Sequence, residues 1–245
     1  MRVVTWNIHH GAPARGPVDL DAVAGVLRPL APDVVVLQEV DRHVGRSGGV
    51  DQAAELGAAL GMAGHFAGAM RWPPNPLSPE PVAGAGAYGI AVLAPPGTPA
   101  PEVLRLPHSR AREPRVATLV RVPAGRGAVT VVGTHLQNGP RLEPRPTEAM
   151  RQLRWLAEHL EAVGEPVVLA GDVNMHRRVA ARVLEPFGWS LAITAPTFPA
   201  SRPARTIDVA AVRGAVVSEA RVPATVVSDH RPIVADLAPP GHRPG

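Results

Sequence analysis

The chain has 245 residues, 45% of them hydrophobic and 19% charged, which is long and apolar enough for a folded protein with a sizeable core. It has no Cys, which excludes disulfides, zinc–thiolate sites and Cys nucleophiles, and no Lys, which excludes Schiff-base chemistry and the P-loop lysine. The formal net charge of +4 is compatible with a phosphate-bearing partner but does not require one.

Short apolar runs rich in β-branched residues predict strands along the whole chain. These expected strands are 2–8, 33–40, 87–94, 115–122, 128–136, 166–171, 206–212, 215–222 and 232–237. Helical spacing of apolar residues predicts helices near 20–30, 51–60 and 148–163. Many strands with a few interposed helices favour a mixed α/β sandwich over a simple alternating parallel fold.

The remaining segments carry few structural signals. Five prolines in 71–85 exclude a regular helix or central strand and predict a surface loop. We expect one catalytic domain over 1–238 and a disordered tail over 239–245. Neither a signal peptide nor a transmembrane run is visible, which predicts a cytoplasmic protein.

Polar side chains recur where the predicted strands end. The first two strands end at Asn7 and at Glu39, and later strands end near His135 and Asp172. Asp208 lies in the strand 206–212, and Asp229 and His230 come just before the last strand. Side chains at the ends of separate strands can converge at one rim of a sheet, so these groups predict a shared site.

The types of these residues indicate metal-assisted chemistry. The carboxylates of Glu39, Asp172 and Asp229 are hard oxygen ligands that suit Mg²⁺, with Mn²⁺ as a possible substitute. Histidines beside them would transfer protons near neutral pH. This combination is suited to the attack of water on a phosphate ester.

Six motifs resemble those of the endonuclease/exonuclease/phosphatase superfamily, which includes deoxyribonucleases, repair endonucleases, sphingomyelinases and inositol-phosphate phosphatases. In chain order, the motifs are TWNIHHG (5–11), LQEVDR (37–42), GTHLQ (133–137), GDVNM (171–175), TID (206–208) and SDHRPIVADL (228–237). The resemblance spans nearly the whole chain. It implies a four-layer α/β/β/α sandwich of two packed mixed sheets flanked by helices.

The resemblance also implies a metal side of the site. Asn7 and Glu39 resemble metal-site residues, with Glu39 the principal carboxylate ligand. Asp229 resembles a second carboxylate on the metal side. In a strand, His9 and His10 would point to opposite faces, so we expect at most one of them to face the site. We expect both to be loop residues or groups that support the ligands from behind.

The implied catalytic side carries the other roles. Asp172 resembles the residue that orients or deprotonates the attacking water, and Asn174 resembles an amide donor to the phosphate. His230 resembles the catalytic histidine, with Asp208 orienting its ring. His135 resembles a second histidine that acts as an acid or as a donor to the phosphate, although 65–71 offers it no convincing acidic partner.

An arginine is expected to contact the phosphate. Arg112 lies in a segment resembling that of the deoxyribonucleases, with Arg115 as the competing candidate. The expected activity is therefore a Mg²⁺-dependent phosphoester hydrolase, most simply a phosphodiesterase. The alternatives are a nuclease acting on DNA or RNA, a phospholipid or inositol-phosphate hydrolase, a monoester phosphatase and a non-catalytic phosphate-binding module. No obligate protein partner is evident.

Overall fold

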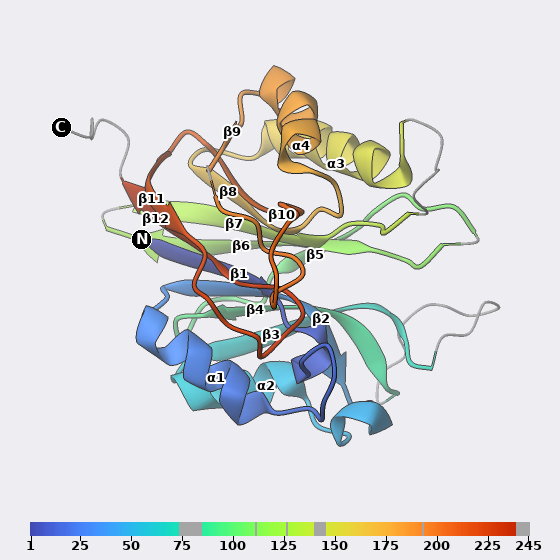
Figure 1. The fold of residues 1–245 in the computed structure, drawn as a ribbon. Coiled ribbons are helices and arrows are strands. Elements are labelled where there is room, and N and C mark those ends of the chain that lie inside the picture. The colour runs from blue at the N-terminus through green and yellow to red at the C-terminus, as the bar shows by residue number, and fades with distance from the viewer. Residues whose placement is uncertain (74–84, 111, 126, 140–145, 193, 239–245) are drawn as a thin grey trace.

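The computed structural model describes residues 1–73, 85–110, 112–125, 127–139, 146–192 and 194–238. Most of the predicted proline-rich loop and the predicted tail 239–245 lie outside these ranges. Two six-stranded sheets pack face to face, with helices on both outer faces (Figure 1). The predicted four-layer α/β/β/α sandwich is confirmed.

The first sheet joins both ends of the chain. Its spatial order is β11 (Val216–Arg221), β12 (Ile233–Ala238), β1 (Arg2–Asn7), β2 (Val34–Arg42), β4 (Ala87–Ala94) and β3 (Ala63–Arg71). β1 and β2 run parallel, whereas the other neighbouring strands are antiparallel. β1 and β2 therefore bring their carboxyl ends to the same edge.

The second sheet repeats this arrangement. Its order is β5 (Glu102–Arg105), β6 (Val116–Ala124), β7 (Gly127–His135), β8 (Val167–Asp172), β10 (Asp208–Arg213) and β9 (Ser190–Leu191). β7 and β8 are parallel, and β10 runs antiparallel to β8 so that its first residue lies opposite the last residue of β8. The short edge strands β5 and β9, together with β3, were not predicted from the sequence.

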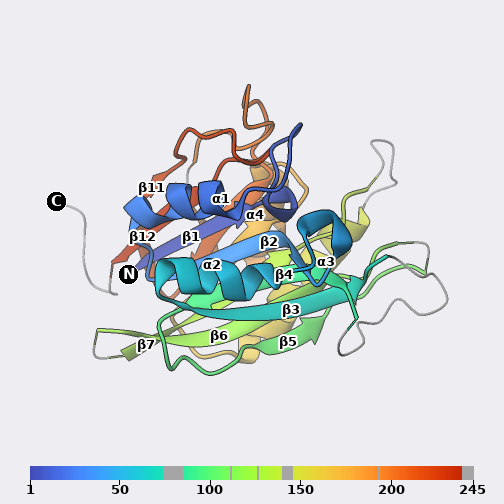
Figure 2. The same cartoon turned by 90° about the horizontal axis from the view of Figure 1, so that it is seen from below.

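Helices cover the outer faces of both sheets. α1 (Leu20–Leu27) and α2 (Gln52–Leu60) lie side by side on the first sheet (Figure 2). α3 (Glu148–His159) and α4 (Arg177–Leu184) cover the second sheet (Figure 1). Short 3₁₀ helices are η1 (His9–Gly11), η2 (Arg28–Leu30), η3 (Gly45–Ser47), η4 (Leu160–Ala162) and η5 (Glu185–Phe187). Side-chain caps fix the first turns: Asp19 caps α1, Asp51 caps α2 and Thr147 caps α3.

The layer between the two sheets is rich in valine. Its buried members come from strands of both sheets and include Val3, Val34, Val36, Val92, Val120, Val131, Val168 and Val212. β-Branched side chains pack well on pleated surfaces, and their burial supplies the main favourable free energy of the fold. This rigid layer fixes the distance between the strand ends of the first sheet and those of the second.

Candidate active site

The polar strand ends meet over one cavity of about 620 Å³. Of the residues predicted from the sequence, those that line it are Glu39, Arg112, Arg115, His135, Asp172, Asn174, Asp229 and His230. Asn7 and Asp208 are buried beneath the lining and bond to it. The sequence therefore identified a set of side chains that the fold brings together.

Asp208 and His230 form a buried pair. Nδ1 of His230 lies 2.9 Å from Oδ2 of Asp208, which also accepts a hydrogen bond from the Thr197 hydroxyl. The indole of Trp6 donates to the backbone oxygen of His230 at 2.8 Å. Burial favours the neutral imidazole, but the charge and hydrogen bond of Asp208, together with the charges of Asp172 and Asp229, raise the pKa of His230 to about 9. The ring is therefore an imidazolium at neutral pH, with Nε2–H facing the cavity.

Asp172 lies between the two histidines. Its Oδ2 is 3.7 Å from Nε2 of His230 and 3.7 Å from Nε2 of His135. Oδ1 accepts from the backbone N–H of Asn174 at 2.9 Å, and Oδ2 accepts from the Asn7 amide at 3.1 Å. Burial and the charge of Asp208 raise the pKa of Asp172 to about 7. A carboxyl group poised near neutral pH is suited to accept a proton.

His135 is held by a cation rather than by an acid. Nη1 of Arg115 lies 3.1 Å from Nδ1 of His135. A guanidinium can only donate, so Nδ1 accepts and the hydrogen of the neutral ring is on Nε2, next to Asp172. Burial, followed by repulsion from Arg115, lowers the pKa of His135 well below its usual value. Of the two predicted roles, this geometry favours hydrogen-bond donation by the neutral ring.

Asn174 follows β8 in the left-handed backbone region, with φ of 50°. Asn tolerates this conformation better than most residues. Its Nδ2 donates to the backbone oxygen of Leu136 at 3.0 Å. Nδ2 also lies 3.2 Å from Nε2 of His135, but this contact is not a hydrogen bond when Nε2 carries the ring hydrogen. The amide thus lies at the cavity wall, where its predicted role as a donor to a phosphate is sterically accessible.

Gly171 allows β7 and β8 to approach closely. Its φ is +153°, and a Cβ there would overlap the carbonyl oxygen of Thr134. The next residues in the two strands, His135 and Asp172, are paired in register. A glycine therefore fixes the relative positions of two site residues.

Glu39 reaches the cavity from a β-bulge. The register of β2 against β4 shifts between Gln38 and Val40, and Glu39 has φ of 58°. Bulges of this kind redirect a side chain. Oε1 of Glu39 accepts from Nδ2 of Asn7 at 3.0 Å, and Oδ1 of Asn7 accepts from the backbone N–H of His9 at 3.1 Å. In this geometry Asn7 positions Glu39. The role of Asn7 as a metal ligand stays a prediction.

The expectation that at most one of His9 and His10 faces the site was wrong. β1 ends at Asn7, and the two histidines lie in η1 with φ of 46° and 49°, so the alternation of a strand does not apply. Both side chains line the cavity. Burial and the nearby Arg46 lower the pKa of His10 to about 4. Their expected position outside the strand is confirmed, but the turn brings both side chains to the cavity.

Two clusters could hold a metal ion among the described residues. Each has three side chains with one donor atom apiece, and the donors lie within 4.8 Å of one another. One is Asp172 with Asp208 and His230; the other is His9 with His10 and Glu39. In the first cluster, Nδ1 of His230 is already hydrogen-bonded to Asp208. Asp229 belongs to neither cluster, although it is half-buried in the cavity wall, so its metal role stays a prediction.

The two candidate arginines have different surroundings. Arg115 is buried, holds His135 and pairs with Glu113 at 2.9 Å. Arg112 is half-buried in the cavity wall. Both contribute positive charge to the cavity, and the choice between them as the phosphate contact stays open. Sequence reasoning missed Phe198, whose ring centroid lies 4.7 Å from that of His230, since it lies outside every recognised motif.

The family assignment follows from comparison with known proteins. The profile of the Endonuclease/Exonuclease/phosphatase family matches residues 4–230, nearly the whole chain. The chain belongs to this family. Membership confirms the expected phosphoester hydrolase class. A search of curated proteins finds no match.

Several solved structures share the fold of this chain. An endonuclease/exonuclease/phosphatase from Beutenbergia cavernae is 27% identical, with a TM-score of 0.80 over 98% of this chain and 72% of that one. The mannosyl-6-phosphatase Bt3783 of Bacteroides thetaiotaomicron is 14% identical, with a TM-score of 0.72 over 97% and 99% of the two chains. Sphingomyelinase C of Streptomyces griseocarneus is 19% identical, with a TM-score of 0.68 over 96% and 98%. Among the described residues, no helix has the length and apolarity needed to cross a bilayer.

Proposed function

We propose that this family member is a metal-dependent phosphodiesterase, with Mg²⁺ as the expected metal. The observation that supports it is one cavity with a charged Asp208–His230 pair and Asp172 on one side and Glu39 on the other. A proton acceptor, a proton donor and a carboxylate free to bind a cation are what water attack on a phosphodiester requires.

The residues around Glu39 fit a divalent cation. The carboxylate is half-buried, and its one hydrogen bond among the described residues leaves an oxygen open to the cavity. Asp229 adds a second carboxylate to the same wall. A cation bound there would neutralise charge on the phosphate.

The side chains on the other side of the cavity from Glu39 supply the proton transfers. Asp172, with a pKa raised to about 7, accepts a proton from the attacking water. His230, charged at neutral pH, donates through Nε2–H to the phosphate or to the leaving oxygen. The neutral His135 donates through Nε2–H, and the arginines of the wall stabilise the growing negative charge.

A panel of phosphate esters tests this proposal. Bis(4-nitrophenyl) phosphate, 4-nitrophenyl phosphate, supercoiled plasmid and sphingomyelin vesicles are incubated with Mg²⁺ or with EDTA. We expect hydrolysis of the diester with Mg²⁺, loss with EDTA, and a decrease of about 10²–10⁴-fold in His230→Ala. His159→Ala, an exposed histidine on α3, is the matched control.

The panel also separates the alternatives. Preference for the monoester would replace the phosphodiesterase proposal with a phosphatase. Cleavage of plasmid or of sphingomyelin alone would identify a nuclease or a lipid hydrolase within the same chemistry. Equal diester hydrolysis by His230→Ala and His159→Ala would contradict the mechanism.

A further inference from the structure

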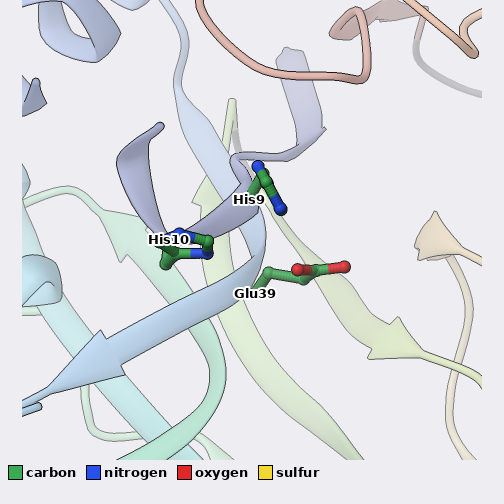
Figure 3. A group of neighbouring side chains, drawn as sticks. All are labelled: His9, His10 and Glu39. Carbon is green, nitrogen blue, oxygen red and sulfur yellow. The ribbon is translucent and has the colours of Figure 1, made fainter. Parts of the chain in front are cut away.

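His9 and His10, to which the proposed hydrolytic steps give no role, form a cluster with Glu39. One donor atom from each lies within 4.8 Å of the other two, and all three side chains line the cavity (Figure 3). Ligands of a tetrahedral zinc ion at about 2.1 Å are separated by roughly 3.4 Å. Small side-chain rotations therefore suffice to bring all three donors onto one ion.

The hydrogen bonding of His9 leaves it ready to ligate. Nδ1 of His9 lies 3.3 Å from the backbone oxygen of Ala12. A carbonyl only accepts, so Nδ1 carries the hydrogen of the neutral ring and Nε2 keeps a lone pair. Metal-binding histidines commonly have this arrangement, in which one ring nitrogen donates to a carbonyl and the other binds the ion. For His10, no hydrogen bond to a ring nitrogen occurs within the described ranges, so its ring nitrogens remain available.

The backbone holds the cluster in place before any ion binds. All three residues have positive φ, which is costly for residues other than Gly and persists only when the surroundings enforce it. Ile8 N–H bonds to Gln38 O at 3.1 Å, which joins η1 to the bulge of β2. The buried Gln52 of α2 donates to His10 O at 2.7 Å and accepts from Asp41 N–H at 2.9 Å.

The nearby cation Arg46, which disfavours positive charge at His10, is partly neutralised. Arg46 forms two hydrogen bonds of 2.8 Å with the carboxylate of Asp41, so its charge is paired. The guanidinium is also stacked 3.9 Å above the ring of Trp72. The cluster itself contributes one negative charge and two imidazoles.

We propose that His9 and His10 join Glu39 in binding a divalent transition-metal ion of the zinc and cobalt type. Imidazole nitrogen suits zinc, cobalt and related ions, whereas Mg²⁺ prefers an all-oxygen set. The inference adds two ligands and a class of metal ion to the proposed function. It rests on that function only for the part that the ion would take in hydrolysis.

Cobalt binding tests the inference without reference to activity. Co²⁺ is titrated into tag-free, EDTA-treated protein. Binding is measured by the d–d absorption of the ion and by the heat of binding. The variants are His9→Asn and His10→Asn, because Asn is the non-glycine residue that best tolerates positive φ. His159→Asn is the control.

We expect one Co²⁺ per chain with imidazole-type absorption in the wild type and in His159→Asn. Affinity should fall on the order of 100-fold in His9→Asn and His10→Asn, since even outer-shell changes cost about 10–100-fold. Absence of a Co²⁺ spectrum in the wild type, or equal affinity in all variants, would overturn the inference. These binding results do not test the proposed function. Only a lack of Mg²⁺-dependent diester hydrolysis would contradict that function.

Discussion

Replacing Asp208 by Asn removes one charge from the buried pair while keeping its shape. With its oxygen in the place of Oδ2, the amide can still accept from both Nδ1–H of His230 and the hydroxyl of Thr197. The imidazole should therefore keep its orientation. What changes is the electrostatic support for its positive charge.

The size of the effect follows from the pKa of His230. Its rise from 6.5 to about 9 corresponds to roughly 3 kcal/mol in favour of the imidazolium. Burial opposes this charge, and Asp208 is the largest contribution that supports it. Without Asp208, burial should lower the pKa of His230 to 6.5 or below. At pH 7.5 a ring with a pKa of 6.5 would be only about one-tenth protonated, so hydrolysis should fall about tenfold, and further if the pKa is lower.

NMR titration of the histidine Cε1–H signals in EDTA-treated protein measures this pKa directly. The His230 signal is assigned from its absence in His230→Gln. Glu158→Gln, which removes an exposed carboxylate on α3, is the control and should leave the titration unchanged. If His230 in Asp208→Asn still titrates above pH 7.5, the charge support comes from Asp172 or Asp229, and the reasoning is refuted.

Three further predictions concern stability and the second histidine. Because the pKa of His230 is raised on folding, its stabilisation is complete below pH 6.5 and lost as the pH rises through about 9. Urea unfolding of metal-free protein should show this decline, and His230→Gln should flatten it; a rise with pH would contradict the linkage. Gly171→Ala should destabilise by about 3 kcal/mol or more through overlap and positive φ, whereas Gly164→Ala, in open space, should be nearly neutral by thermal unfolding. Arg115→Met should raise the pKa of His135 in an NMR titration by removing a repulsive charge, and an unchanged pKa would exclude that cause.

The sequence predicted which side chains the fold brings together where those side chains lie at strand ends. Asn7, His135 and Asp172 end strands and Asp208 begins one, and these strands were recognisable as apolar runs. The parallel pairs β1–β2 and β7–β8 then gather these ends at one edge of each sheet. A local pattern was sufficient because the period of a strand fixes where its last side chain lies.

The sequence failed where the backbone leaves its regular path. The turn at His9 and His10 and the bulge at Glu39 depend on bonds to Gln38 and Gln52, which are distant in the chain. The edge strand β3 (Ala63–Arg71) is rich in Gly and Ala, and tertiary pairing with β4 overrides its weak strand propensity. Arg115 could not be recognised as the partner of His135, because only the pairing of β6 with β7 brings them together.

The cavity draws side chains from both sheets, which would keep the proposed metal binding and proton transfer in register. The proposed metal half comes from β1, η1 and β2 of the first sheet. The proposed proton-transfer half combines β7, β8 and β10 of the second sheet with His230, which lies just before β12 of the first sheet. Their separation is set by the close-packed valine layer, which resists compression. The amide of Asn7 bonds to Glu39 at 3.0 Å and to Asp172 at 3.1 Å, so it ties the two halves directly. Surrounding loops can therefore differ among relatives and alter substrate choice without changing the distance between the metal half and the water-activating carboxylate.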